Sequence, residues 1–156
     1  MDVCIIADDL TGANDAGVQC AGNGYTPAVA LTDTLSSAML QEQVLIVNTD
    51  SRPLGAQQAY NRVRRTADVL ASGKPDIVYK KLDSTLRGAV GAELDAVYDA
   101  FQPDFIVVNP SYPDKHRIIK EGRLYVNEVP LAGRRLHNVC RPDSRNIQRG
   151  RAHRSP

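Results

Sequence analysis

Short apolar segments recur along the chain, and each one gives way to a cluster of polar side chains. The segments show little internal alternation of polar and apolar residues, which predicts strands buried on both faces of a sheet. A further strand, less uniformly apolar, is expected near residues 26–31. The segments with polar ends are residues 3–7, 44–47, 77–81 and 105–108.

Helical patterns separate most of these strands. Residues 12–20 form a modest helical pattern that ends near residues 22–24, where two glycines favour a left-handed C-cap. A short helix is expected at 35–40, and a longer one after Pro53, which suits a first helical turn. Apolar residues spaced by three and four also predict a helix over residues 90–101.

This alternation predicts an α/β fold, with a three-layer, mainly parallel sheet flanked by helices. Two apolar segments around a polar turn predict a small β-hairpin near residues 117–126. The carboxyl ends of parallel strands lie along one edge of the sheet, where ligands bind. We therefore expect the polar clusters to converge on one edge and to form the functional site.

The net charge of +1 becomes informative when the chain is divided at residue 133. Residues 1–133 carry 12 Lys and Arg against 17 Asp and Glu, whereas residues 134–156 carry seven arginines and one acidic residue. We expect an incomplete α/β domain at 1–133 and a disordered basic tail at 134–156. A nucleic-acid-binding arm is the alternative. The abrupt change in composition fits a truncation or reading-frame change better, so we expect no nucleic-acid partner.

The remaining composition points to the cytoplasm. No run approaches the roughly 20 apolar residues of a membrane span, and no charged-then-apolar signal peptide opens the chain. The three cysteines show no metal-ligand spacing and fit reduced thiols. We expect a cytoplasmic protein without membrane contact.

The first polar cluster pairs two carboxylates, Asp8 and Asp9, with Thr11 at the start of a helix. Adjacent carboxylates can orient a hydroxyl, act as a general base or hold a metal. A plain helix N-cap is the alternative role for either aspartate. A haloacid-dehalogenase-type phosphatase would need aspartates two residues apart, and Leu10 occupies the second position.

The cluster that begins at Lys80, where the apolar residues 77–79 end, is the richest in charge, and Arg52 on a neighbouring loop offers a fork suited to a carboxylate. Either hydroxyl of the cluster could cap the following helix, whose N-terminus favours an anion. A solvated, charge-paired loop is the alternative, as is an Arg52 paired with Asp50. Together these side chains favour a small, anionic, hydroxyl-rich ligand. The cluster contains Lys80, Lys81, Asp83, Ser84, Thr85 and Arg87.

Several nucleotide and hydrolase motifs are absent from the sequence. There is no G-x-x-x-x-G-K-[ST] loop and no G-x-G-x-x-G after a strand. No histidine precedes His116, which argues against a Ser-His-Asp arrangement. We therefore assign no cofactor-binding or metal-binding residue to this chain.

Four motifs, in order and at fitting separations, resemble the four-carbon acid sugar kinases. That family phosphorylates threonate, erythronate and 3-oxo-tetronate with ATP. The resemblance runs from about residue 3 to residue 132, and His116 departs from it where many members carry glycine. The motifs are IADDLTGAND (6–15), NTDSR (48–52), YKKLDSTLRG (79–88) and GRLYVNEVPL (122–131).

The resemblance implies an N-terminal domain that binds the sugar acid and a C-terminal domain that binds ATP with Mg²⁺. It implies that Arg52 and Lys81 hold the substrate carboxylate and hydroxyls, and that Asp9 or Asp83 is the catalytic carboxylate. Since the ATP domain is missing, we expect neither ATP binding nor kinase activity from this chain alone. The alternative is a non-catalytic sugar-acid-binding module or an inert truncated remnant. The other substrate-binding residues implied are Asp8, Thr11, Lys80, Ser84, Thr85 and Arg87.

Overall fold

The computed structural model of the chain describes residues 1–135. Its principal elements alternate between strands and helices, as the sequence predicts, before ending in three consecutive strands. They are β1 (Val3–Ala7), α1 (Leu10–Gly22), β2 (Pro27–Ala30), β3 (Val44–Asn48), α2 (Ala56–Ser72), β4 (Ile77–Lys81), α3 (Val90–Phe101), β5 (Arg117–Lys120), β6 (Arg123–Val126) and β7 (Val129–Arg135).

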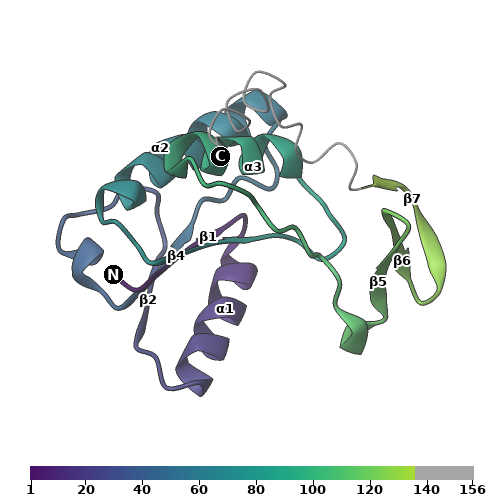
Figure 1. The fold of residues 1–156 in the computed structure, drawn as a ribbon, viewed down its shortest axis with the longest axis horizontal. Helices are drawn as coiled ribbons and strands as arrows, with labels where there is room; N and C mark the ends of the chain where they lie inside the picture. The colour runs from purple at the N-terminus through teal and green to yellow at the C-terminus, as the bar shows by residue number, and fades with distance from the viewer. Residues whose placement is uncertain (136–156) are drawn as a thin grey trace, which may run out of the picture.

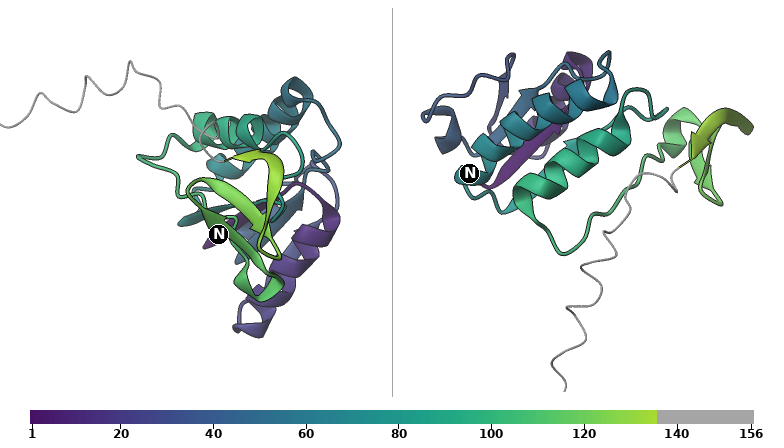
Figure 2. Two further views of the ribbon diagram at one scale, coloured as in Figure 1. Left: turned by 90° about the vertical axis from the view of Figure 1, so that its right-hand side faces the viewer. Right: turned by 90° about the horizontal axis from the view of Figure 1, so that it is seen from above.

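The main sheet has four parallel strands in the order β2-β3-β1-β4. Helix α1 covers one face, while α2 and α3 lie side by side on the other (Figures 1 and 2). The predicted three-layer α/β fold, with a mainly parallel sheet, is therefore confirmed.

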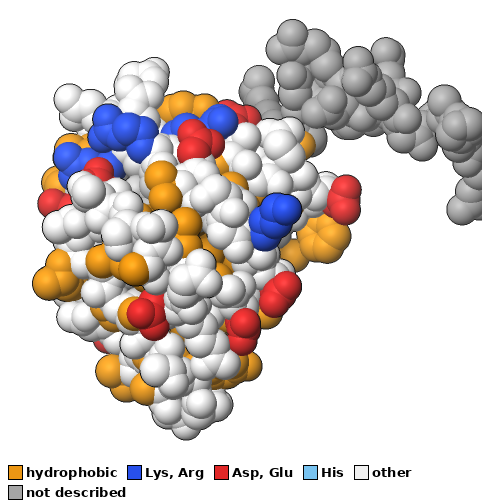
Figure 3. Space-filling model, turned by 90° about the vertical axis from the view of Figure 1, so that its left-hand side faces the viewer, with side chains coloured by type: hydrophobic (Ala, Val, Ile, Leu, Met, Phe, Trp, Pro, Cys, Tyr) orange, Lys and Arg blue, Asp and Glu red, His pale blue; other side chains and the backbone are white. Residues whose placement is uncertain are grey.

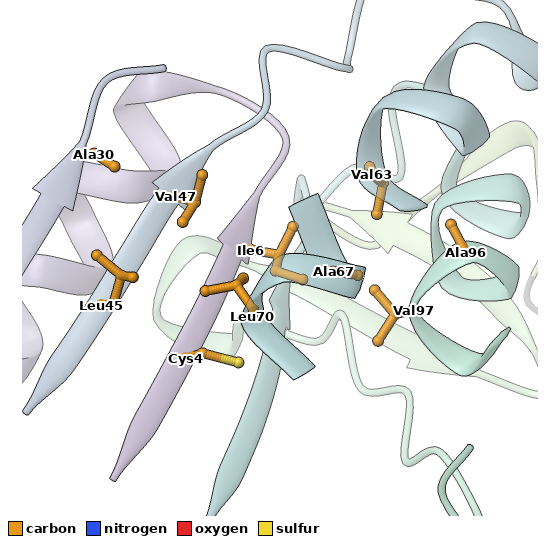
Figure 4. Packing of buried hydrophobic residues seen from close by; sticks show 10 residues of the cluster. All are labelled: Cys4, Ile6, Ala30, Leu45, Val47, Val63, Ala67, Leu70, Ala96 and Val97. Atoms are coloured by element: carbon orange, nitrogen blue, oxygen red, sulfur yellow. The ribbon is translucent and has the colours of Figure 1, made fainter. Parts of the chain in front are cut away.

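Side chains of β1 and β3 alternate between two apolar cores, because successive strand residues point to opposite faces. Ile5 and Ile46 pack with Ala13 and Ala16 of α1. The opposite core is larger and includes side chains from α2 and α3 (Figure 4). Burial on both faces explains why these strands read as continuous apolar runs. The larger core contains Cys4, Ile6, Ala30, Leu45, Val47, Val63, Ala67, Leu70, Ala96 and Val97.

A second sheet confirms the predicted hairpin and adds a strand to it. β5, β6 and β7 form an antiparallel sheet in that order, beside the carboxyl end of β4 (Figure 1). Leu124 is fully buried in a small cluster with Leu86 and Leu94, which joins this sheet to the main body. β7 continues through Arg135, two residues past the expected domain boundary, and the rest of the predicted basic tail lies outside the described residues.

The strand predicted at residues 105–108 does not form, and the main sheet ends at β4. Ile106 and Val108 pack against the cluster around Leu124, whereas Phe105 and Val107 are 75% and 79% exposed. The segment therefore has one covered face and no strand partner among residues 1–135. Its apolar composition indicated burial, but a strand also needs a hydrogen-bonding neighbour.

Two helix predictions also need correction. The helix expected at 35–40 is a single 3₁₀ turn at Met39–Gln41. The helix expected after Pro53 begins later, at Ala56, because Leu54 donates its amide to Ser51 in a preceding turn. Helical periodicity predicted the long amphipathic part of α2, but it did not predict where the helix begins, which depends on the local turn.

Arginines on the outer surface of α2 form salt bridges with acidic residues. Arg64 pairs with Asp68 at 2.8 Å, and Arg65 lies 4.0 Å from Asp33. Lys and Arg side chains gather on the α2 side of the face drawn in Figure 3. In the described part of the chain, no helix is long and apolar enough to cross a membrane.

Candidate functional site

Three polar clusters meet at one edge of the main sheet. The parallel register aligns Ala7 with Asn48 on one side and with Lys81 on the other. The residues that follow these three positions therefore leave the sheet at the same edge. The predicted convergence of the ends of β1, β3 and β4 is observed, without a contribution from a strand at 105–108.

Arg52 joins the first two clusters through both adjacent aspartates. Its Nε donates to Asp8 Oδ2 at 2.8 Å, and its Nη2 donates to Asp8 Oδ1 at 3.0 Å. Its Nη1 also donates to Asp9 Oδ2. We call these three residues the acidic clamp. The alternative pairing of Arg52 with Asp50 is not the one found, and the hydrogen bond with Asp8 raises the pKa of Arg52.

The two carboxylates of the acidic clamp differ in exposure. The Asp8 side chain is 3% exposed, whereas that of Asp9 is 24% exposed. Asp9 is the N-cap of α1 and accepts a hydrogen bond from Gly12 N at 2.7 Å. The N-cap role and a role in the site therefore coexist in one side chain. Thr11, in the first turn of α1, is exposed beside it.

Gly12 allows β4 to approach the start of α1. A methyl group on Gly12 would lie 2.9 Å from Asp9 Oδ1 and 3.6 Å from Lys81 Nζ. The Lys81 ammonium donates to Leu82 O at 3.3 Å and forms no salt bridge with a described carboxylate. Lys81 is therefore a cation next to the acidic clamp with donors left for a ligand.

Lys80 lies on the other side of the sheet. Adjacent strand residues point to opposite faces, and the Lys80 side chain, 4% exposed, lies 2.7 Å from Glu93 Oε2 of α3. The pair is close without good hydrogen-bond geometry, since Glu93 Oε2 has no hydrogen-bond partner among the described residues. The structure therefore separates Lys80 from the site and places it in the α3 layer.

The loop after β3 is fixed to β1 by buried hydroxyls. Thr49 donates from both its amide and its Oγ1 to Ala7 O, at 2.9 and 2.8 Å. Thr49 Oγ1 also lies 2.9 Å from Ser51 Oγ, and Arg52 N donates to Asp8 O at 3.2 Å. These contacts hold the Arg52 backbone in place. Sequence reasoning missed them, although two hydroxyl residues beside Arg52 were a possible signal.

Residues 83–88, here called the Asp83 loop, are organised around one carboxylate. Asp83 accepts hydrogen bonds from Thr85 N at 3.1 Å and from the Thr85 hydroxyl. It also accepts from Arg87 N, Nε and Nη2 at 3.2, 3.0 and 2.8 Å. Burial opposes ionisation of Asp83, but the hydrogen bonds from Arg87 and Thr85 outweigh it and hold its pKa well below the usual range. Asp83 is therefore an acceptor largely occupied by its own loop, and it shapes that loop.

The Asp83 loop does not cap a helix directly. α3 begins at Val90, its N-cap is Ala89, and no side chain caps it. The anion site expected from a helix N-terminus at Ser84 or Thr85 is therefore not formed by those residues. Instead, Gly88 at φ +86° brings the loop against the second cluster, where a methyl group on it would lie 3.3 Å from Arg52 O.

The second sheet brings an additional cation to the site. Arg117, the first residue of β5, donates from Nη1 to Ser84 Oγ. Tyr112 and Arg117 exchange backbone hydrogen bonds of 2.7 and 3.1 Å, which anchors the start of β5. Sequence reasoning missed this residue, because 33 positions separate it from Ser84 and it stands in an otherwise ordinary hairpin strand.

The arrangement combines ligand-binding donors and acceptors within one edge of the sheet. Asp9 offers partly exposed carboxylate oxygens, Lys81 an ammonium, and Ser84 and Thr11 hydroxyls. Such a set can bind the hydroxyl groups and the negative charge of a small polar molecule. No group of three or more His, Cys, Asp or Glu residues within residues 1–135 is placed to hold a metal ion.

Comparison with known proteins identifies the family of this chain. Residues 3–144 match the family model described as a sugar-binding N-terminal domain. The chain is 42% identical to D-erythronate kinase from Heliobacterium modesticaldum, over 83% of this chain and 30% of the relative. It is 39% identical to D-threonate kinase from Salmonella typhimurium, over 84% and 31%. The chain therefore spans about a third of the length of these relatives.

A solved structure shows the same fold. A Bordetella bronchiseptica protein, crystallised with bound citrate as a domain-swapped dimer, is 39% identical and superposes with a TM-score of 0.78. The match covers 83% of this chain and 34% of the other. Together with the family match, it confirms the resemblance drawn from the sequence motifs.

Proposed function

This chain belongs to the family of sugar-binding N-terminal domains, and from that membership we propose that it binds a four-carbon sugar acid at the carboxyl ends of β1, β3 and β4. In a complete enzyme this binding would present a substrate hydroxyl for phosphorylation. The relatives named as D-erythronate and D-threonate kinases support the substrate class. The citrate in the Bordetella structure shows that a protein of this fold accepts a small polyacid.

The observation that carries the proposal is the juxtaposition of the acidic clamp with Lys81. A sugar acid presents hydroxyl groups, which need acceptors as well as donors, and one carboxylate, which needs a cation. Asp9 supplies the partly exposed acceptor, and Lys81 supplies a cation next to it. An apolar ligand would leave these groups unpaired, at a cost in affinity.

The two carboxylates implied in catalysis have different roles in this proposal. Asp83 already accepts hydrogen bonds from Thr85 and Arg87 on both of its oxygens. Asp9 is more open, so we assign the orientation of the reacting hydroxyl to Asp9 and the shaping of the Asp83 loop to Asp83. Arg52 then acts by holding Asp8 and Asp9 in place.

Phosphoryl transfer in a complete kinase would also need ATP and Mg²⁺, which supply the phosphoryl group and neutralise its charge. The residues of the site do not fit either group. Their sequence contains no phosphate-binding glycine loop, and the described residues contain no cluster suited to a metal. The function that we propose for this chain is therefore limited to binding and orienting the sugar acid.

Calorimetric titration of the purified chain tests the proposal. D-erythronate and D-threonate should bind saturably, and Lys81→Ala should weaken binding by about tenfold or more, since a charge-assisted hydrogen bond contributes about 1.5–3 kcal/mol. Lys74→Ala is the control, because Lys74 is an exposed lysine before β4, at the opposite end of that strand. Absence of binding by the folded wild-type chain, or equal effects of the two variants, would refute the proposed site.

A further inference from the structure

One edge of the Arg117 guanidinium has no hydrogen-bond partner among residues 1–135. Its Nη1 donates to Ser84 Oγ, while its Nε is buried without a hydrogen-bond partner among residues 1–135. No described carboxylate forms a salt bridge with it. A buried donor without an acceptor is unfavourable, so this guanidinium is positioned with part of its binding capacity unused.

Among the charged residues of the acidic clamp, Lys81, the Asp83 loop and Arg117, only Arg117 has no compensating charge. The acidic clamp contains two carboxylates and one guanidinium, and Lys81 beside it offsets the remaining negative charge. Asp83 and Arg87 form a neutral pair within the Asp83 loop. Arg117 is therefore the surplus cation, and an anionic ligand would neutralise it.

In Arg52, the guanidinium edge formed by Nε and Nη2 binds a carboxylate. Its Nε and Nη2 hold the Asp8 carboxylate in a bidentate pair, whereas the same edge of Arg117 has no hydrogen-bond partner within the described residues. Arg52 has its own carboxylates, so it is less suited to bind another one. Planar bidentate pairing is the strong mode of carboxylate recognition by arginine.

We propose that Arg117 binds the carboxylate of the four-carbon sugar acid through Nε and Nη2, with Ser84 holding the guanidinium in position. This assignment rests on the proposed function and makes the second sheet part of the substrate site. Because other atoms of the chain cover Nε, the proposal requires the start of β5 to shift when the carboxylate enters.

The experiment compares the wild-type chain, Arg117→Ala and Arg117→Gln, with Arg123→Ala as the control. Arg123 is an exposed arginine on the neighbouring strand β6, without a salt bridge to a described carboxylate. Each protein is titrated calorimetrically with D-threonate, with threitol, which keeps the hydroxyls and lacks the carboxylate, and with inorganic phosphate. Thermal unfolding is recorded for each variant, so that affinities are compared among folded proteins.

Both Arg117 variants should bind D-threonate at least tenfold more weakly than the wild type, with threitol binding and Arg123→Ala unchanged. Unchanged threonate affinity in both variants would overturn the assignment. An equal loss for threonate and threitol would also overturn it, because Arg117 would then only support the loop. Loss of phosphate binding with threonate binding intact would assign the guanidinium to a phosphate instead. Failure of the wild type to bind either sugar acid would refute the proposed function itself.

Discussion

Removal of Arg52 should destabilise the chain through the carboxylates that it leaves behind. Arg52→Ala deletes three donors to Asp8 and Asp9 and leaves Asp8, with a side chain only 3% exposed, as a buried charge without its partner. Breaking a fully buried ion pair in this way costs about 3–5 kcal/mol. The Arg52 side chain is 19% exposed, so water partly replaces it, and we expect a loss of about 2–4 kcal/mol.

Urea unfolding followed by circular dichroism measures this loss, with Arg64→Ala as the matched control. Arg64 pairs with Asp68 at the same 2.8 Å, but these side chains are 34% and 51% exposed. Water screens an exposed pair of this kind, so it contributes much less to stability than a buried pair. If Arg52→Ala were no more destabilising than Arg64→Ala, the acidic clamp would not be a buried, stabilising unit.

Three further predictions follow from the site and its supports. Lys80→Ala should lower the free energy of unfolding by about 3–5 kcal/mol, because Glu93 is left buried and unpaired. The threonate affinity of the folded fraction should stay unchanged. Loss of affinity without loss of stability would place Lys80 in the site. The depressed pKa of Asp83 means that its stabilising effect is present above its ordinary pKa of 3.8 and is lost as the pH falls below it toward the folded-state pKa. The acid limb of stability should therefore be shallower in Asp83→Asn, and an unchanged limb in pH-dependent unfolding would contradict this. Burial raises the pKa of Cys4 to about 12. Cys4 should therefore resist iodoacetamide at pH 8 in the folded chain and react on unfolding, as followed by mass spectrometry. Labelling of Cys4 at the same rate as the partly exposed Cys20 would show that the core around Cys4 is open to solvent.

The layers of the fold could be predicted because a strand buried on both faces has a continuous apolar sequence. β1 and β3 contribute side chains to two cores, and so they read as uninterrupted apolar runs. The segment at 105–108 is also a continuous apolar run, but it does not form a strand. Apolar composition indicates that a segment is buried. Strand formation also needs a hydrogen-bonding neighbour, which the local sequence does not specify.

The site could be predicted as a set of residues but not as a set of contacts. Lys80 and Lys81 are indistinguishable in sequence, and only the orientation of β4 decides that Lys80 meets Glu93 while Lys81 lies near Gly12. Arg52 was expected to face a ligand carboxylate, but it holds two carboxylates of the protein itself. The contact between Arg117 and Ser84 joins the second sheet to the Asp83 loop, and no local sequence pattern indicated it.

The most direct test of the central claim is a ¹⁵N–¹H NMR titration of the chain with D-threonate. We expect saturable shifts at the backbone amides of Asp9, Lys81 and Ser84, where the carboxyl ends of β1 and β4 meet the acidic clamp and the Asp83 loop. Amides on the outer face of α2 should not respond. Unperturbed amides at the sheet edge in the presence of excess threonate, or shifts confined to other parts of the chain, would contradict the assignment of a sugar-acid site to this edge.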